Sequence, residues 1–209
     1  MANTARRREV RRYDFCAYDG RLIFQKIRYE PGRDGRPKDF AYYDVLDRRY
    51  GKPRNADTLI YNLPRVLKAT EQGEAIHWAE GEKDADALMA AGVVATSVHQ
   101  GAGKVTQQQA RWLRESWQPI FIWVDKDAEH HEVGAYDACL RHDRLREVGF
   151  DGEIVFLRAA GAWGQVKDAA DHLAAGFTVA QAIVVDESRL KKVAARYTAG
   201  AGRRAGYVR

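Results

Sequence analysis

From residue 75 onward, short apolar runs alternate with segments of helical periodicity. Four runs have the length and the β-branched or aromatic content of buried strands: 75–81 (AIHWAEG), 93–101 (VVATSVHQG), 120–125 (IFIWVD) and 153–157 (EIVFL). Strands that alternate with helices in this way pair in parallel and are covered on both faces. The sequence therefore predicts an α/β fold with a Rossmann-like, four-stranded parallel sheet and helices on both of its faces.

The segment before this alternation has a different character. Between residues 13 and 50, three strand-like runs are separated by turns rich in Gly, Pro and Asp, which is typical of antiparallel β structure. We therefore expect a basic N-terminal tail (1–12), a small β-rich, basic subdomain (13–72), an α/β catalytic domain (73–176), and a C-terminal helix with a flexible basic tail (177–209). Within the β-rich subdomain, the cations predicted to contact nucleic acid are Lys26, Arg28 and Lys38.

Charge is distributed unevenly along the chain. Residues 1–70 carry 17 Lys and Arg against 9 Asp and Glu, residues 71–187 carry 10 against 20, and residues 188–209 carry 7 against none. An acidic centre between basic segments indicates a cation-binding site with a polyanion such as nucleic acid as its partner. No apolar run approaches the length of a membrane span, and no hydrophobic segment follows the basic start, so we expect a cytoplasmic location. Cys16 and Cys139 form no CxxC pair, so no zinc is expected on this chain.

Carboxylates gather where the predicted strands end. Asp125 and Asp127 follow the third strand, Glu80 follows the first, and Asp84 comes one helical turn later. Ligand sites of parallel sheets lie at the carboxyl ends of the strands, so these groups are expected to converge. Oxygen-only donors of this kind suit Mg²⁺ or Mn²⁺, and two such ions can assist phosphoryl transfer. Glu82 and Asp86 are expected on a solvated helix face.

Two short motifs resemble known sites but lack required residues. The loop GAGKVT could approach a phosphate through Gly101, Gly103 and Lys104. It is not a nucleotide-binding P-loop, because Val98 and Val105 occupy positions that require Gly and Ser or Thr. The run HHEVG is not a zinc-hydrolase motif, because Ala135 stands where the second His belongs.

Three motifs in order resemble the TOPRIM domain, the catalytic fold of DnaG-type and phage primases, of topoisomerases and of some nucleases. They are EGEKDADAL (80–88), VDKDAEHHEVG (124–134) and KDAADHL (167–173), within a match to residues 73–175. The first and last forms are most similar to the primase branch. The resemblance implies the catalytic acidic residues Glu80, Asp84, Asp125, Asp127 and Asp168. Of these, Glu80, Asp125, Asp127 and Asp168 would bind two Mg²⁺ or Mn²⁺ ions. Where many primases have a second Asp, this chain has Ala170, and the neighbouring Asp171 is a candidate to replace that Asp.

The resemblance implies a primase-like nucleotidyltransferase that makes primers on a single-stranded DNA template in bacterial, phage or plasmid replication. Nucleoside triphosphates would be substrates, with Lys83, Lys104 and Lys167 as phosphate-binding cations. A separate helicase and a zinc-module protein are expected partners in trans. Alternatives stay open: the same metal cluster could hydrolyse nucleic acid as a nuclease, and the chain could be a non-catalytic nucleic-acid-binding subunit of a replication complex. A haloacid-dehalogenase-type phosphatase is disfavoured because Ala128 follows the DxD pair.

Overall fold

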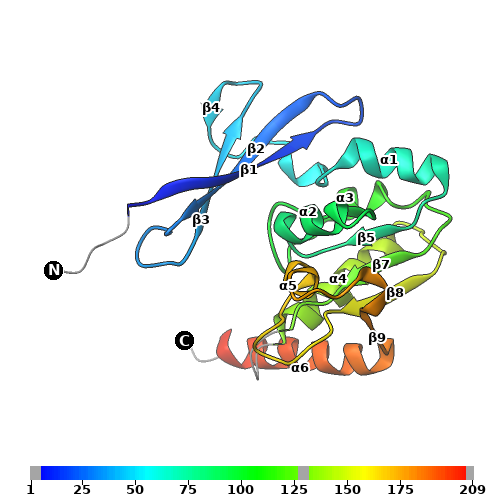
Figure 1. The fold of residues 1–209 in the computed structure, drawn as a ribbon. Coiled ribbons are helices and arrows are strands. Elements are labelled where there is room, and N and C mark those ends of the chain that lie inside the picture. Colours follow the sequence, from blue (N-terminus) through cyan, green and yellow to red (C-terminus); the bar gives the residue numbers. More distant parts are fainter. Residues whose placement is uncertain (1–5, 127–131, 206–209) are drawn as a thin grey trace.

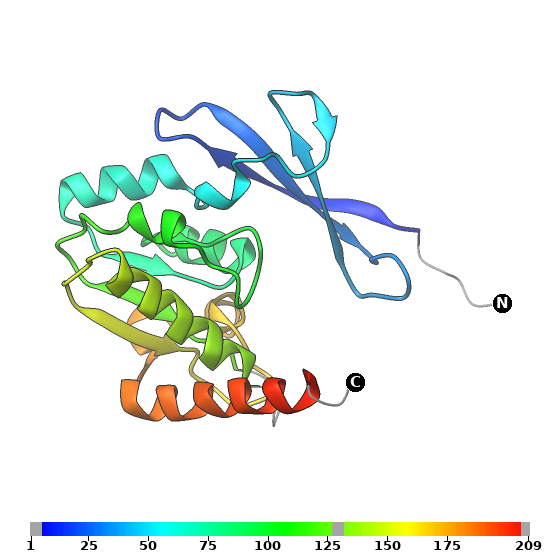
Figure 2. The ribbon, with the colours of Figure 1, turned by 180° about the vertical axis from the view of Figure 1, so that it is seen from behind.

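The computed structural model of the protein describes residues 6–126 and 132–205, and their side chains up to residue 198 (Figures 1 and 2). Its strands form two separate sheets. The first, here called the N-terminal sheet, is an antiparallel meander in the order β1-β2-β3-β4. The second, here called the central sheet, has the order β6-β5-β7-β8-β9. The N-terminal sheet stands beside one end of the α/β unit rather than stacking on a face of the central sheet (Figure 1).

The N-terminal sheet is formed by β1 (Arg8–Cys16), β2 (Leu22–Glu30), β3 (Asp39–Asp44) and β4 (Arg49–Tyr50). Its core face is aromatic. Phe15 and Phe24 are fully buried and stack with ring centroids 4.5 Å apart. Tyr61, in the connection that leads to the central sheet, packs against Phe15, which fixes the N-terminal sheet to the rest of the molecule.

The central sheet confirms the predicted α/β architecture. Its parallel strands are β5 (Ile76–Trp78), β6 (Val94–Thr96), β7 (Ile120–Trp123) and β8 (Ile154–Arg158). A fifth strand, β9 (Ile183–Val185), adds to β8 in the antiparallel direction. Strand β9 was not predicted from sequence, because three residues with no flanking periodicity give no detectable strand pattern.

Helices cover both faces of the central sheet (Figures 1 and 2). Contacts group α3 (Gln107–Arg111), α4 (Val133–Glu147) and α6 (Glu187–Ala205) on one face. The opposite face carries α2 (Glu82–Ala90) and α5 (Ala169–Ala174). Helix α1 (Leu63–Gln72) contacts both β6 and β1, so it lies between the two sheets. Short 3-10 turns occupy Ala56–Thr58 and Val179–Gln181. No helix in the described residues is long and apolar enough to cross a membrane.

A buried ion pair joins the N-terminal sheet to helix α2. Lys26 of β2 donates to both carboxylate oxygens of Glu82 on α2, each at 2.8 Å, and both side chains are at most 6% exposed. Asp86, one turn further along α2, accepts from Tyr61 at 2.8 Å and from Arg11 of β1 at 2.8 Å. The expectation of a solvated face for Glu82 and Asp86 was wrong, because this side of α2 faces the N-terminal sheet.

Candidate active site

The carboxyl ends of β5 and β7 place two of the predicted acidic residues at one edge of the central sheet. The two strands are paired neighbours with Trp78 opposite Ile122. Glu80 follows β5 by two residues and Asp125 follows β7 by two residues. Glu80 and Asp125 therefore leave adjacent strands at the same edge, here called the carboxyl edge. Asp127 lies outside the described residues.

Asp125 is enclosed among other acidic groups. Burial, followed by the negative charges of Glu80, Asp84 and Asp168, raises the pKa of Asp125 well above its ordinary value. The positive charge of Arg141 lowers the pKa of Asp125, but its effect is smaller than that of burial and the acidic groups. These four acidic residues, here called the carboxylate cluster, therefore converge in the structure, although they come from three separate segments of the chain.

A glycine that the sequence analysis overlooked allows this arrangement. A Cβ atom at Gly134, in the first turn of α4, would lie 2.4 Å from the carbonyl oxygen of Asp125. Real Cβ atoms essentially never approach so closely, and backbone cannot yield as a flexible side chain can. Gly134 thus lets α4 begin directly against the segment that carries Asp125. The motif VDKDAEHHEVG contained this glycine, but only the close approach shows its role.

Asp84 and Asp168 meet where the first turns of α2 and α5 come together. Asp168 is the N-cap of α5, and its side chain accepts from the backbone N–H of Asp171 at 2.8 Å. Asp84 accepts from the backbone N–H of Ala170 at 3.1 Å. Burial and the charge of Asp168 raise the pKa of Asp84 to about 7. The pKa of Asp168 is lowered, because hydrogen bonds from Asp171 and Lys83 outweigh its burial.

This pair predicts a pH-dependent difference in stability between the wild type and Asp84→Asn. The unfolded Asp84 loses its proton near pH 4, whereas the folded one keeps it to about pH 7, so folding becomes less favourable as the pH rises between these values. An amide imitates the protonated carboxyl. The free energy of unfolding of Asp84→Asn is therefore expected to rise relative to that of wild type as the pH increases. The difference between the two proteins should grow by about 2 to 3 kcal/mol from pH 5 to pH 8.

The measurement is urea unfolding of both proteins in a chelator across this pH range. Only the difference between them is informative, because burial lowers the pKa of His77 and of His99 to about 4. These histidines destabilise the fold as the pH falls, which is the opposite direction, and they are common to both proteins. A difference that does not change with pH would contradict the assignment to Asp84.

A second buried network, centred on Arg141 of α4, holds the strand ends at the carboxyl edge. It was not predicted from sequence. Arg141 of α4 is 1% exposed and donates to the carbonyl oxygens of Trp78 at 2.6 Å and of Trp123 at 2.9 Å. These carbonyls end β5 and β7. Arg141 also pairs with Asp137 at 2.8 Å, and Asp137 accepts from the backbone N–H of Gly103 at 2.7 Å. One arginine thus links the ends of both strands, and through Asp137 it links them to the glycine loop.

The cations predicted to bind phosphate differ in their surroundings. Lys83 donates to Asp168 at 2.9 Å and lies 3.6 Å from Asp171, so in this structure it neutralises the carboxylate cluster. Lys167 and Lys104 are exposed. Gly101 and Gly103 both have positive φ, 76° and 74°, which explains the glycines of the loop that ends at Lys104.

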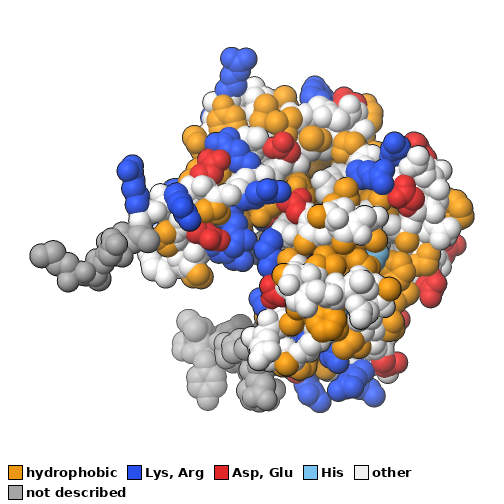
Figure 3. Space-filling view, in the orientation of Figure 1, with side chains coloured by type: hydrophobic (Ala, Val, Ile, Leu, Met, Phe, Trp, Pro, Cys, Tyr) orange, Lys and Arg blue, Asp and Glu red, His pale blue; other side chains and the backbone are white. Residues whose placement is uncertain are grey.

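The N-terminal sheet brings further cations to the carboxylate cluster. The pKa of Lys38 is lowered first by burial and then by the positive charges of Arg28, Lys167 and Lys83. Asp84 has the opposite effect. Lys38 therefore lies among cations of the N-terminal sheet and of the α/β unit, and close to the carboxylate cluster. Figure 3 shows Lys and Arg side chains gathered along the hollow beneath the N-terminal sheet.

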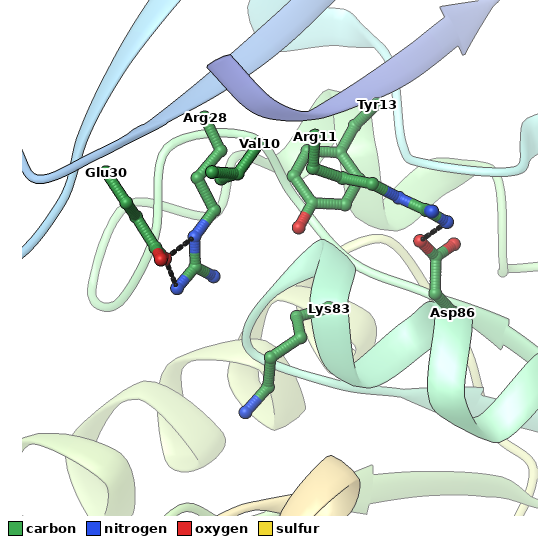
Figure 4. A pocket seen from close by; sticks show the side chains of 7 residues that line it. All are labelled: Val10, Arg11, Tyr13, Arg28, Glu30, Lys83 and Asp86. Carbon is green, nitrogen blue, oxygen red and sulfur yellow. Dashed lines mark hydrogen bonds and ion pairs between the residues drawn. The ribbon is translucent and has the colours of Figure 1, made fainter. Parts of the chain in front are cut away.

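A cleft of about 330 Å³ opens between β1, β2 and α2 (Figure 4). Its lining residues are Val10, Arg11, Tyr13, Arg28, Glu30, Lys83 and Asp86. Arg28 points into it and pairs with Glu30, while Lys83 reaches from α2 on the other side. Lys26, which the sequence analysis grouped with Arg28, is instead held by Glu82 in the interior. Its ammonium group is not exposed to a nucleic acid.

The carboxylate cluster has the chemistry of a divalent-cation site, but not a preformed coordination sphere. Among residues 6–126 and 132–205, no three His, Cys, Asp or Glu side chains are grouped closely enough to hold a metal ion as they stand. However, burial and then the negative charges of Glu80, Asp84 and Asp168 raise the pKa of Asp125, so its ionised form is unfavourable without a cation. A hard cation would stabilise the ionised form, and oxygen-only donors fit Mg²⁺ or Mn²⁺. The donor set thus fits such an ion.

No protein-family model matches the chain, and no curated protein sequence matches it.

Solved structures do match, and they are primase catalytic cores. The Escherichia coli primase catalytic core gives a TM-score of 0.60 at 15% identity, over 86% of this chain and 53% of that one. The RNA polymerase domain of Mycobacterium tuberculosis DnaG gives 0.55 at 15% identity, over 90% of this chain and 55% of that one. A DnaG primase catalytic domain bound to single-stranded DNA gives a TM-score of 0.55 at 15% identity, over 83% of this chain and 51% of that one.

The chain therefore spans about half the length of the structures that it matches. At this identity the match establishes the fold. The resemblance to a TOPRIM domain of the DnaG primase type is confirmed at that level, including a β-rich unit before the α/β sheet.

Proposed function

We propose that the chain is a primase-like nucleotidyltransferase that uses a divalent metal, nucleoside triphosphates and a single-stranded DNA template. One observation carries the proposal. Cations from the N-terminal sheet, Arg28 and Lys38, converge with Lys83 and Lys167 beside an enclosed carboxylate cluster. A polyanionic substrate can be held by such cations while the carboxylates hold the ions that act on it. The shared fold with a DnaG domain solved with single-stranded DNA supports the same interpretation.

Glu80, Asp125 and Asp168 would hold the metal, together with Asp127. Bound Mg²⁺ or Mn²⁺ supplies stabilisation of the attacking and leaving oxygens in phosphoryl transfer. Asp84 keeps a different role. Its raised pKa and its hydrogen bond from Ala170 fit a residue that shares a proton with Asp168 and holds the starts of α2 and α5 together. Arg141 fixes the strand ends, so that Glu80 and Asp125 stay adjacent.

The remaining cations would bind the substrates. Lys83 and Lys167 lie beside the carboxylate cluster and would contact the triphosphate, and the loop ending at Lys104 would contact it from the neighbouring strand. Arg28 and Lys38 would hold the template backbone on the side of the N-terminal sheet. Lys26 has no part in this path, because Glu82 holds it in the interior.

A synthesis assay tests the proposal. Purified protein is incubated with single-stranded DNA, labelled nucleotides and Mg²⁺ or Mn²⁺, with Asp125→Asn as the inactive control. New oligonucleotides made only by wild type, and only with metal, are the expected result. If the template is shortened and nothing is synthesised, the protein is a nuclease and the proposal is wrong. If the protein binds DNA but forms neither product, it is a non-catalytic nucleic-acid-binding subunit.

Primer synthesis at a replication fork requires opened duplex and a choice of start site. We therefore extend the proposal to a helicase and a zinc-module protein acting in trans, in the bacterial cytoplasm and in phage or plasmid replication. Addition of a replicative helicase should raise the yield of primers on duplex templates but not on single strands.

A further inference from the structure

Helix α6 carries basic side chains along one face, at a position that the proposed function does not use. Arg189, Lys192 and Arg196 are all exposed, and Arg196 is 75% exposed. At 3.6 residues per turn they lie within about 60° of one another around the helix, and they span about 10 Å along it. These three residues are here called the basic stripe. The buried residues of α6, Leu190 and Ala194, point elsewhere, so the stripe is not needed for packing.

The stripe leads to the carboxyl edge of the central sheet. Helix α6 runs antiparallel to α4: Glu187 lies 3.6 Å from His142, whereas Tyr197 packs against Tyr136 with ring centroids 4.9 Å apart. Arg196 lies 3.8 Å from Glu132, the residue that precedes α4. Helix α4 begins against Asp125. In Figure 1 the same end of α6 points toward the side on which the N-terminal sheet overhangs the molecule.

We propose that the basic stripe of α6 binds the phosphate backbone of double-stranded nucleic acid, the primer–template duplex, as it leaves the carboxyl edge. This inference rests on the proposed function for the identity of the duplex. Surfaces that bind single strands combine cations with exposed aromatic rings for base stacking. Among the described side chains of α6, the one aromatic, Tyr197, is occupied by Tyr136. The basic stripe has cations but no ring available for base stacking. It is therefore suited to contact the phosphates of a duplex, whose bases are already stacked on one another.

The charge of α6 supports the same conclusion. Between residues 188 and 209 the sequence has seven Lys and Arg and no Asp or Glu. Glu187, at the start of the helix, is bound by Lys191 at 2.6 Å, and Lys191 lies outside the stripe. Among the described side chains, the acidic groups that act on the stripe are Glu132, 3.8 Å from Arg196, and Asp186, whose pKa the charge of Lys192 helps to lower. All three stripe side chains are nevertheless exposed to an external anion.

The test is duplex binding by fluorescence anisotropy, without metal or nucleotides, as salt is varied. The variant Arg189→Gln/Lys192→Gln/Arg196→Gln keeps helix-forming side chains. The control Lys68→Gln/Arg111→Gln/Arg114→Gln removes the same charge from exposed positions on and beside α1 and α3. The stripe variant should bind duplex roughly tenfold more weakly, and its slope of log affinity against log salt should fall by about 2 to 3. The control should change little.

Three outcomes would overturn the inference. They are an unchanged salt slope, an equal loss in the control, and an equal loss for a single-stranded oligonucleotide. Because Arg196 contacts Glu132, the double variant Arg189→Gln/Lys192→Gln is measured as well, with an expected fall in slope of about 2. The readout needs no catalysis. If the protein makes no primers but the stripe variant loses duplex binding, the proposed function is overturned; duplex binding by the basic stripe then stands, and the identification of that duplex as a primer–template falls.

Discussion

Asp125→Asn is expected to abolish metal-dependent synthesis and, in the absence of metal, to stabilise the fold. The amide has nearly the same shape but removes a negative charge from the carboxylate cluster. Burial and the charges of Glu80, Asp84 and Asp168 raise the pKa of Asp125, so its ionised form is unfavourable in the folded protein. Loss of this charge should raise the free energy of unfolding at pH 8 by on the order of 1 kcal/mol. Activity should fall by on the order of 10³-fold, because a ligand of the catalytic ion is lost.

The opposite signs of the two effects make this prediction specific. A variant that merely misfolds would lose both activity and stability. Thermal unfolding in a chelator and then in Mg²⁺ adds a second measurement, since an ion that binds only the folded protein raises its melting temperature. Wild type should respond to Mg²⁺, and Asp125→Asn should respond much less. The control is Asp151→Asn, an exposed carboxylate in the turn before β8, at the opposite edge of the central sheet. Full activity of Asp125→Asn would show that the metal site is misplaced.

The sequence predicted those features that repeat or that lie close together along the chain. Four apolar strands alternating with helices were enough to predict the parallel sheet, and their ends located Glu80 and Asp125 at one edge. The structure then brought Asp84 and Asp168 into the same cluster. The short antiparallel strand β9 has no such pattern, so it was not predicted.

Buried charges could not be predicted, because their burial depends on partners far away in the sequence. Lys26 and Glu82 are 56 residues apart. From sequence, each is predicted to be an exposed residue of an amphipathic strand or helix. Arg141 lies on a helix with many polar residues, and nothing local shows that it binds the carbonyls of Trp78 and Trp123. The carboxylates were predictable from their motifs, but the groups that hold them in place were not.

Removal of one partner of the Lys26–Glu82 pair is expected to have the largest effect on stability. Lys26→Met leaves the Glu82 carboxylate buried without its cation, and Glu82→Leu leaves the ammonium group in the same position. Each single variant should lose about 3 to 5 kcal/mol of the free energy of unfolding. The double variant Lys26→Met/Glu82→Leu should recover most of this loss, because apolar pairs of similar volume replace buried ion pairs at little cost. Urea unfolding of all four proteins gives the coupling energy directly.

The same double variant decides the role of Lys26. Lys26 was predicted from sequence to contact nucleic acid, whereas the structure places its ammonium group against Glu82 and over the ring of Phe40, 4.4 Å from the centroid. Lys38 is the matched comparison, because it lies among the cations of the hollow. Lys38→Met should lower the salt slope for single-stranded DNA by about 0.7. The double variant should keep the wild-type slope, since its buried pair contacts no phosphate. A fall in slope in the double variant equal to that of Lys38→Met would instead mean that the N-terminal sheet separates from α2 to expose Lys26 when DNA binds.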